Sequence, residues 1–124
     1  MTPQERNILI AEAMGIEIIR HAELGLIMSK NGGQFIYPIK IWNPSENAEQ
    51  EKMIKAKLRE WGCTYEGLYE TINRKNLFWF TIFYYKKSLF KKREQKYISK
   101  SSYSESTAFL DAVGELCLTL KNQK

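Results

Sequence analysis

Hydrophobic and polar positions along the chain recur with the period of a helix in some segments and of a strand in others. Thr2-Pro3-Gln4-Glu5 is a helix cap with proline at the first helical position, and Gly15 ends this helix about three turns later. Two apolar segments, 26–28 and 35–37, then flank Asn31-Gly32, a pair that tolerates the positive φ of a tight turn. We therefore expect a short N-terminal helix followed by a β-hairpin.

A second helix and a last helix are indicated by apolar stripes that follow capping residues. Ser45 opens a helix expected over Ser45–Trp61, in which Ile54, Leu58 and Trp61 share one face and Gly62 is the stop. Ser104 or Ser106 caps a final helix over Ser104–Lys121. The apolar residues that share a face of this last helix are Phe109, Val113, Leu116, Cys117 and Leu120.

Three strands are expected between these two helices. Segment 64–72 alternates loosely, 73–76 is a turn, and Leu77–Tyr85 is apolar on both faces, which predicts the centre of a covered sheet. The third strand is expected within Leu89–Ser99, where lysines suit an edge because charge discourages pairing with another chain. The pattern predicts one α+β domain over 1–124, with an antiparallel β-meander packed between α-helices as an α/β/α sandwich, besides the short N-terminal helix and hairpin.

The size of the chain bears on its assembly and its compartment. A domain of 124 residues with 13% aromatic residues is not expected to cover both faces of its sheet, so we predict a homo-oligomer, a dimer or a multiple of it. Cys63 and Cys117 lie far apart in apolar settings, which is typical of reduced thiols in a reducing cytoplasm. The chain has no apolar run of the roughly 20 residues that span a bilayer, and its start is too polar for a signal peptide. We expect a cytoplasmic protein.

Residue types that carry catalysis are sparse. His21 is the single histidine, and neither cysteine has a sequence neighbour that would lower its pKa or complete a metal-ligand spacing. Gly32-Gly33 is not a phosphate loop, because no Gly-Lys-Ser/Thr follows it. The sequence therefore predicts a protein that is not an enzyme and holds no metal or cofactor.

The surplus positive charge is confined to residues 86–100. This stretch holds seven cations and one acid, Glu94, a net charge of +6 in a chain whose total is +5. It directly follows Leu77–Tyr85, the most aromatic run. Rings beside clustered cations can stack a base and neutralise phosphates, which favours a nucleotide-like anion as ligand. The alternative interpretation is a buried aromatic strand whose neighbour is kept soluble by lysines.

Short motifs spread over most of the chain resemble one family. They are the apolar helix 8–15 that ends in Met-Gly, the helix opening Trp42-Asn43-Pro44-Ser45, and the closing helix at 106–112. The chain resembles small phage proteins of the α/β/α sandwich type, and within that group the Thoeris anti-defence sponges of the first kind, the Tad family. It departs from the pattern at Ala108 and Phe109, where proline and arginine are usual, and in its more basic third strand.

The resemblance implies a phage protein that acts in the host bacterial cytoplasm. Such a protein binds and sequesters, without cleaving it, a cyclic ADP-ribose isomer made by TIR-domain immune enzymes; some relatives hold cyclic oligonucleotides, and the family assembles through symmetric subunit contacts. The alternative is a basic nucleic-acid-binding phage protein that uses residues 86–100 as a phosphate stripe, and a third possibility is a structural subunit without a ligand. A double-stranded RNA-binding domain is disfavoured, because such a domain needs lysines at the start of its last helix and this helix starts with Ser104-Glu105.

A cyclic nucleotide signal presents a pyrophosphate and a purine. Its site needs cations or backbone donors for the first and a flat apolar wall for the second. Arginine is favoured over lysine because its planar fork grips two oxygens at once. The candidate ligand-binding residues are Phe83 and Tyr85 for the wall, Arg74, Lys86 and Arg93 for the phosphates, and Trp42, Asn43 and Asp111 for the ribose or the adenine edge.

Overall fold

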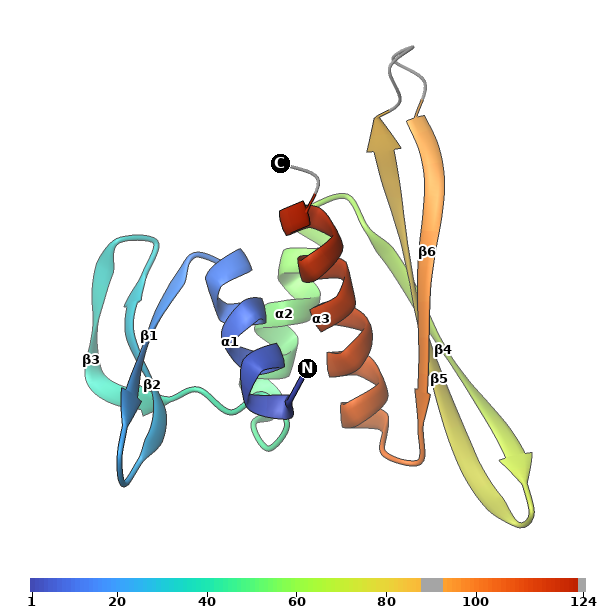
Figure 1. Cartoon of the computed structure of the whole chain (residues 1–124), viewed down its shortest axis with the longest axis horizontal. Coiled ribbons are helices and arrows are strands. Elements are labelled where there is room, and N and C mark those ends of the chain that lie inside the picture. The colour runs from blue at the N-terminus through green and yellow to red at the C-terminus, as the bar shows by residue number, and fades with distance from the viewer. Residues whose placement is uncertain (88–92, 123–124) are drawn as a thin grey trace.

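The computed structural model describes residues 1–87 and 93–122, without the side chains of Lys87 and Arg93. These residues form two antiparallel three-stranded sheets with helices between them (Figure 1). The order along the chain is α1 (Pro3–Ala13), β1 (Ile16–His21), β2 (Gly25–Asn31), β3 (Gln34–Ile41), α2 (Ala48–Glu60), β4 (Thr64–Ile72), β5 (Lys75–Lys87), β6 (Arg93–Ser102) and α3 (Glu105–Asn122). The α+β class, the antiparallel meander and the N-terminal helix with its hairpin are confirmed, and the layers run sheet, helices, sheet.

The helix ends follow the capping residues, with one shift. The side chain of Thr2 accepts a hydrogen bond from the backbone N–H three residues on (3.1 Å), and Gly15 takes a φ of +79° after α1. The α2 helix begins at Ala48 rather than at Ser45, because Asn47 is the residue that caps it. Ser45 lies in the turn before the helix, where its hydroxyl donates to the Asn43 side chain.

The N-terminal sheet has the strand order β1-β2-β3. The expected hairpin is β2–β3, and its turn uses Gly32 and Gly33 at φ +61° and +86°, where glycine carries no steric penalty. The sequence analysis did not predict β1, which pairs antiparallel with β2. Its six residues contain the run Ile18-Ile19, which interrupts the alternation that marks a strand.

The C-terminal sheet has the order β4-β5-β6, so β5 lies at its centre as predicted. The β4–β5 turn is Asn73-Arg74, both at positive φ, and β6 runs back along β5 from Arg93. Leu89 and Phe90, expected in the third strand, lie outside the described residues. The helices cover one face of β5, that of Phe80 and Ile82.

The core lies between the two sheets. Phe80 meets Phe109 of α3 edge to face, with 4.9 Å between ring centroids, and Ile82 beside it is fully buried. Trp42 is 1% exposed, and its Nε1–H donates to the Asn7 carbonyl at 2.8 Å. This hydrogen bond connects the segment between β3 and α2 to α1. Apolar side chains of β2 close the other side of this core. One continuous core therefore holds the helices against both sheets.

Candidate ligand-binding groove

An open groove runs past the C-terminal ends of all three helices. Its first hollow, of about 370 Å³, is lined by Leu9, Glu12, Ala13, Trp61, Cys117, Leu120 and Lys121. A second hollow of about 370 Å³ adjoins it at Trp61 and Leu120 and reaches β5, with Glu60, Gly62, Cys63, Tyr84, Tyr85 and Leu116 in its wall. We call the two together the Trp61 groove. Each hollow lies within the size range of small-molecule sites.

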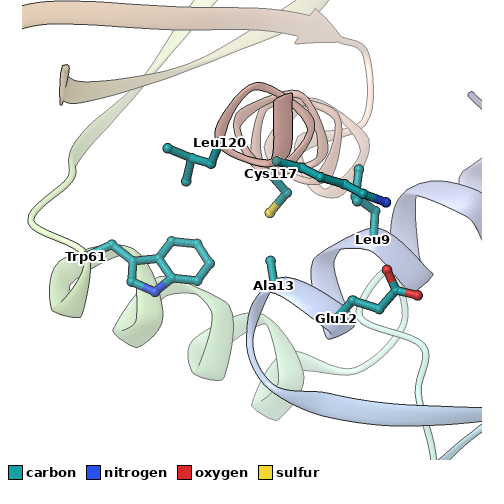
Figure 2. A pocket seen from close by; sticks show the side chains of 7 residues that line it. Leu9, Glu12, Ala13, Trp61, Cys117 and Leu120 are labelled. Carbon is teal, nitrogen blue, oxygen red and sulfur yellow. The ribbon is translucent and has the colours of Figure 1, made fainter. Parts of the chain in front are cut away.

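Trp61 occupies the groove because of its place at the end of α2. It is the C-cap of α2, where its backbone N–H donates to the Lys57 carbonyl (2.9 Å), and Gly62 at φ +79° then turns the chain away. Its side chain therefore extends past the helix end. Figure 2 shows the indole facing Cys117 and Ala13 across the hollow, with Leu120 above it. The result is a flat aromatic wall in a largely apolar recess.

The charges around the groove are mixed. Three helix C-termini meet here, and each carries a partial negative charge that disfavours an anion close by. Two acids, Glu12 and Glu60, line the groove. Glu60 is paired with Lys57 at 3.2 Å, which offsets its charge. Lys121 contributes a cation at the α3 end, and Lys86 follows Tyr85 on β5. The apolar part of a ligand thus suits the helix ends, and an anionic part suits the β5 side.

The two cysteines that line the groove are protonated at neutral pH. Burial raises the pKa of the Cys63 thiol, and burial together with the nearby Cys63 raises the pKa of Cys117 to about 12. A thiol becomes a nucleophile only as the thiolate. Cys63 and Cys117 therefore act as apolar wall and not as reactive groups.

His21 lies in the N-terminal sheet, apart from the groove. Its Nδ1 accepts hydrogen bonds from the backbone N–H groups of Glu23 and Leu24, both at 3.1 Å, so it holds the β1–β2 turn. Among residues 1–87 and 93–122 no three of His, Cys, Asp and Glu are grouped as a metal site would need. The groove offers stacking and shape for binding, with no nucleophile or metal site among its lining residues.

Two of the candidate residues from the sequence lie at the β5 side of the groove. Tyr85 lines it and is 55% exposed, and Lys86 comes next along the strand. Phe83 lies on the outer face of the sheet instead, paired in register with Thr64 and Tyr97.

The other candidates are distributed over the molecule. Arg74 lies in the β4–β5 turn, at the opposite end of β5 from Lys86 and about 40 Å away for a strand of this length. Trp42 is in the core, and Asn43 donates its backbone N–H to the Gln50 side chain. Asp111 accepts from Arg6 at 2.8 Å and so links α3 to α1. The structure does not bring the eight residues into one site; Arg93 begins β6, and its side chain lies outside the described part.

Trp61 is the residue that the sequence reading missed as a functional candidate. It was assigned to the apolar stripe of the second helix, with Ile54 and Leu58, which are indeed buried. Its position directly before Gly62, which ends the helix, could have distinguished Trp61 from Ile54 and Leu58, because a large ring at a helix end extends beyond the packed stripe.

In the described part of the chain no helix is long and apolar enough to cross a membrane.

Comparison with known proteins found no relative of this chain. The chain matches no protein-family model, no curated protein and no solved structure.

Proposed function

We propose that the protein binds a small nucleotide-type signal in the Trp61 groove and holds it without cleaving it. The observation that carries this proposal is the partly buried indole of Trp61, which lines an apolar recess, with Tyr85 and Lys86 at its β5 side. A planar base suits the indole, and phosphates suit the lysine-bearing end of β5. The sequence resemblance supplies the finer identity: a phage anti-defence sponge for a cyclic ADP-ribose isomer made by TIR-domain enzymes.

The geometry also orients such a ligand. Stacking a base on an aromatic side chain contributes about 1–3 kcal/mol, and Trp61 offers the larger ring for it. The partial negative charge of the helix ends repels a pyrophosphate from the α1 and α3 termini. We therefore propose that the purine lies against Trp61 and the pyrophosphate toward Lys86 on the β5 side.

Sequestration, rather than turnover, agrees with the groups that line the groove. Both thiols are protonated, and His21 holds a turn in the other sheet. The direct test is to heat the complex of protein and cyclic ADP-ribose isomer until the protein denatures, and to assay the supernatant. Recovery of intact signal is expected, whereas a degraded product would contradict the proposal.

Nucleic-acid binding by residues 86–100 is less well supported. Lys96 contacts Glu94 at 3.1 Å, Lys100 contacts Glu115 at 2.6 Å, and Lys86 lies opposite Glu94 in register. The described cations of this stretch therefore have acidic neighbours, whereas a phosphate stripe gains affinity from cations that exchange counterions freely.

Calorimetry separates the two functions. We expect the cyclic ADP-ribose isomer to bind with little dependence on salt, and duplex RNA and single-stranded DNA not to bind. Polymer binding that falls steeply between low and high salt would favour the nucleic-acid function instead.

Variants locate the site. Trp61→Leu keeps an apolar side chain but removes the stacking surface, so affinity for the signal should fall about ten- to a hundred-fold. Lys52→Glu is the matched control, since Lys52 is exposed on α2; Lys55 is less suitable because its Nζ lies 5.3 Å from the Phe109 ring centroid. If Trp61→Leu binds the signal as tightly as the parent, the site lies elsewhere.

A further inference from the structure

The face of the N-terminal sheet that turns away from the helices is apolar and uncovered. Ile19, Ile27 and Ile41 lie side by side across the three strands, and Figure 1 shows helices on only one side of this sheet. The edge strand β3 adds Phe35, Tyr37 and Ile39, which are 81%, 94% and 65% exposed and lie where the β2–β3 register is irregular, between Phe35 and Lys40. We call these six residues the isoleucine face.

The isoleucine face lies at the upper end of the apolar patch size that single chains expose. Two nearly bare aromatic rings and the half-exposed Ile19, Ile39 and Ile41 present about 600 Å² of apolar surface, and Ile27 between them is 9% exposed. Two such faces packed together remove about 1,200 Å² from water, which reaches the size of a specific, stable interface.

The rim of the face favours a second copy over a membrane. Lys30 and Glu17 approach to 4.0 Å at one end, so both signs of charge are present at the rim. A two-fold axis can bring each charge to its opposite, as an isologous interface requires. Anionic lipids would instead select a rim of cations alone.

The edge of the sheet argues for face-to-face packing. Pro38 stands in the middle of β3, the edge strand, and has no N–H to donate to a neighbouring strand. Extension of the sheet through this edge is therefore interrupted. Sheets that stack face to face, about 10 Å apart, need only interdigitating apolar side chains, and the isoleucine face provides them.

We propose that the isoleucine face is the interface of a homodimer in which two N-terminal sheets pack face to face about a two-fold axis. This inference is independent of the ligand. Among the described residues, the N-terminal sheet contributes none to the lining of the Trp61 groove, so both grooves stay open in the dimer.

Sedimentation of the full chain at tens of micromolar tests the interface. The parent should sediment as a dimer, and the double substitution Tyr37→Glu/Ile39→Lys should raise the dissociation constant by at least about thirty-fold, since it places charges within the apolar face. Both side chains are exposed, so circular dichroism should show an unchanged fold. Phe35→Ser is a milder change and should also raise the dissociation constant. It serves as a second test in case the double variant does not fold.

The matched control lies on the other sheet. Leu68→Glu/Tyr97→Lys changes two residues that are 62% and 70% exposed on the outer face of the C-terminal sheet, and this variant should remain a dimer. A parent that is monomeric at tens of micromolar would overturn the proposal, and flotation of that monomer with phosphatidylcholine–phosphatidylglycerol vesicles would assign the face to a membrane. Dissociation by the control alone would move the interface to the C-terminal sheet.

Discussion

The two sheets share one architecture and differ in their outer faces. Each is a three-stranded antiparallel meander with helices against one side. On the outer face of the C-terminal sheet, the Trp79 Nε1–H donates to Glu70 at 3.0 Å, and the hydroxyls of Thr81 and Ser99 lie 2.9 Å apart. Among the six residues of the isoleucine face, the one polar side-chain group is the Tyr37 hydroxyl. Exposed rings alone therefore do not distinguish the two outer faces; the polar groups between the rings do.

The inner faces differ as well. The C-terminal sheet gives Phe80 and Ile82 to the core and is packed along β5 and β6 by α3. The N-terminal sheet is joined to the rest through β1 and α1 and through buried residues of β2. Because α1 and α3 pack on each other, their contact connects the two sheets. Stability should therefore depend most on the C-terminal sheet and next on the contact between these helices.

The largest effect is expected for Phe80→Ala. Phe80 is 4% exposed between the rings of Tyr65 and Phe109, so its removal leaves a cavity and should lower the free energy of unfolding by about 3–5 kcal/mol. Urea denaturation at one submicromolar protein concentration measures this without a contribution from association. Phe35→Ala, at an 81% exposed ring, should change the same quantity by less than about 0.5 kcal/mol. If both variants lose the same free energy of unfolding, the two sheets do not differ in their contribution to stability.

An intermediate effect is expected for Asp111→Ala. Arg6 has a side chain only 7% exposed and contacts Asp111 at 2.8 Å, so the variant leaves a guanidinium without its carboxylate partner. We expect a loss of about 2 kcal/mol in the free energy of unfolding, because Asp111 itself is partly exposed. A double-mutant cycle with Arg6→Met measures the coupling between the two residues. Strictly additive losses would mean that the ion pair does not join α1 to α3.

The smallest effect is expected for Trp79→Phe on the outer face of the C-terminal sheet. It removes one hydrogen bond, to Glu70, in a setting open to water, so the free energy of unfolding should change by less than about 1 kcal/mol. Sedimentation should show the same oligomeric state as the parent. A change of oligomeric state would mean that this face, too, binds a second copy.

Local structure was largely readable from the sequence because it depends on neighbouring residues. The Thr2 cap, the Gly32-Gly33 turn and the apolar stripe of α3 gave the right elements, since each acts within a few residues. Two features of the structure differ from the expectation because their local sequence signals were weak or ambiguous. Asn47 rather than Ser45 caps α2, and β1 was too short and too irregular in alternation to stand out.

The candidate site was only partly readable. Tyr85 lines the groove, but Arg74 and Lys86 are separated by the whole of β5. Trp42 precedes α2 and Trp61 follows it, and sequence alone gave no reason to bury the first completely and the second only in part. Burial follows from what packs on each ring, here α1 on Trp42 and open space at the helix end beside Trp61.

The sequence by itself determined the elements, their order and the scarcity of catalytic groups, because capping, periodicity and residue type are local properties. Only the tertiary structure decided that three helix ends meet at Trp61, that Lys96 and Lys100 contact acids, and that Ile19, Ile27 and Ile41 form one row. Each of these depends on segments distant in sequence, through strand register and helix packing. The physical reason is that local rules choose the shape of a segment, whereas burial of apolar surface across the whole chain chooses its neighbours.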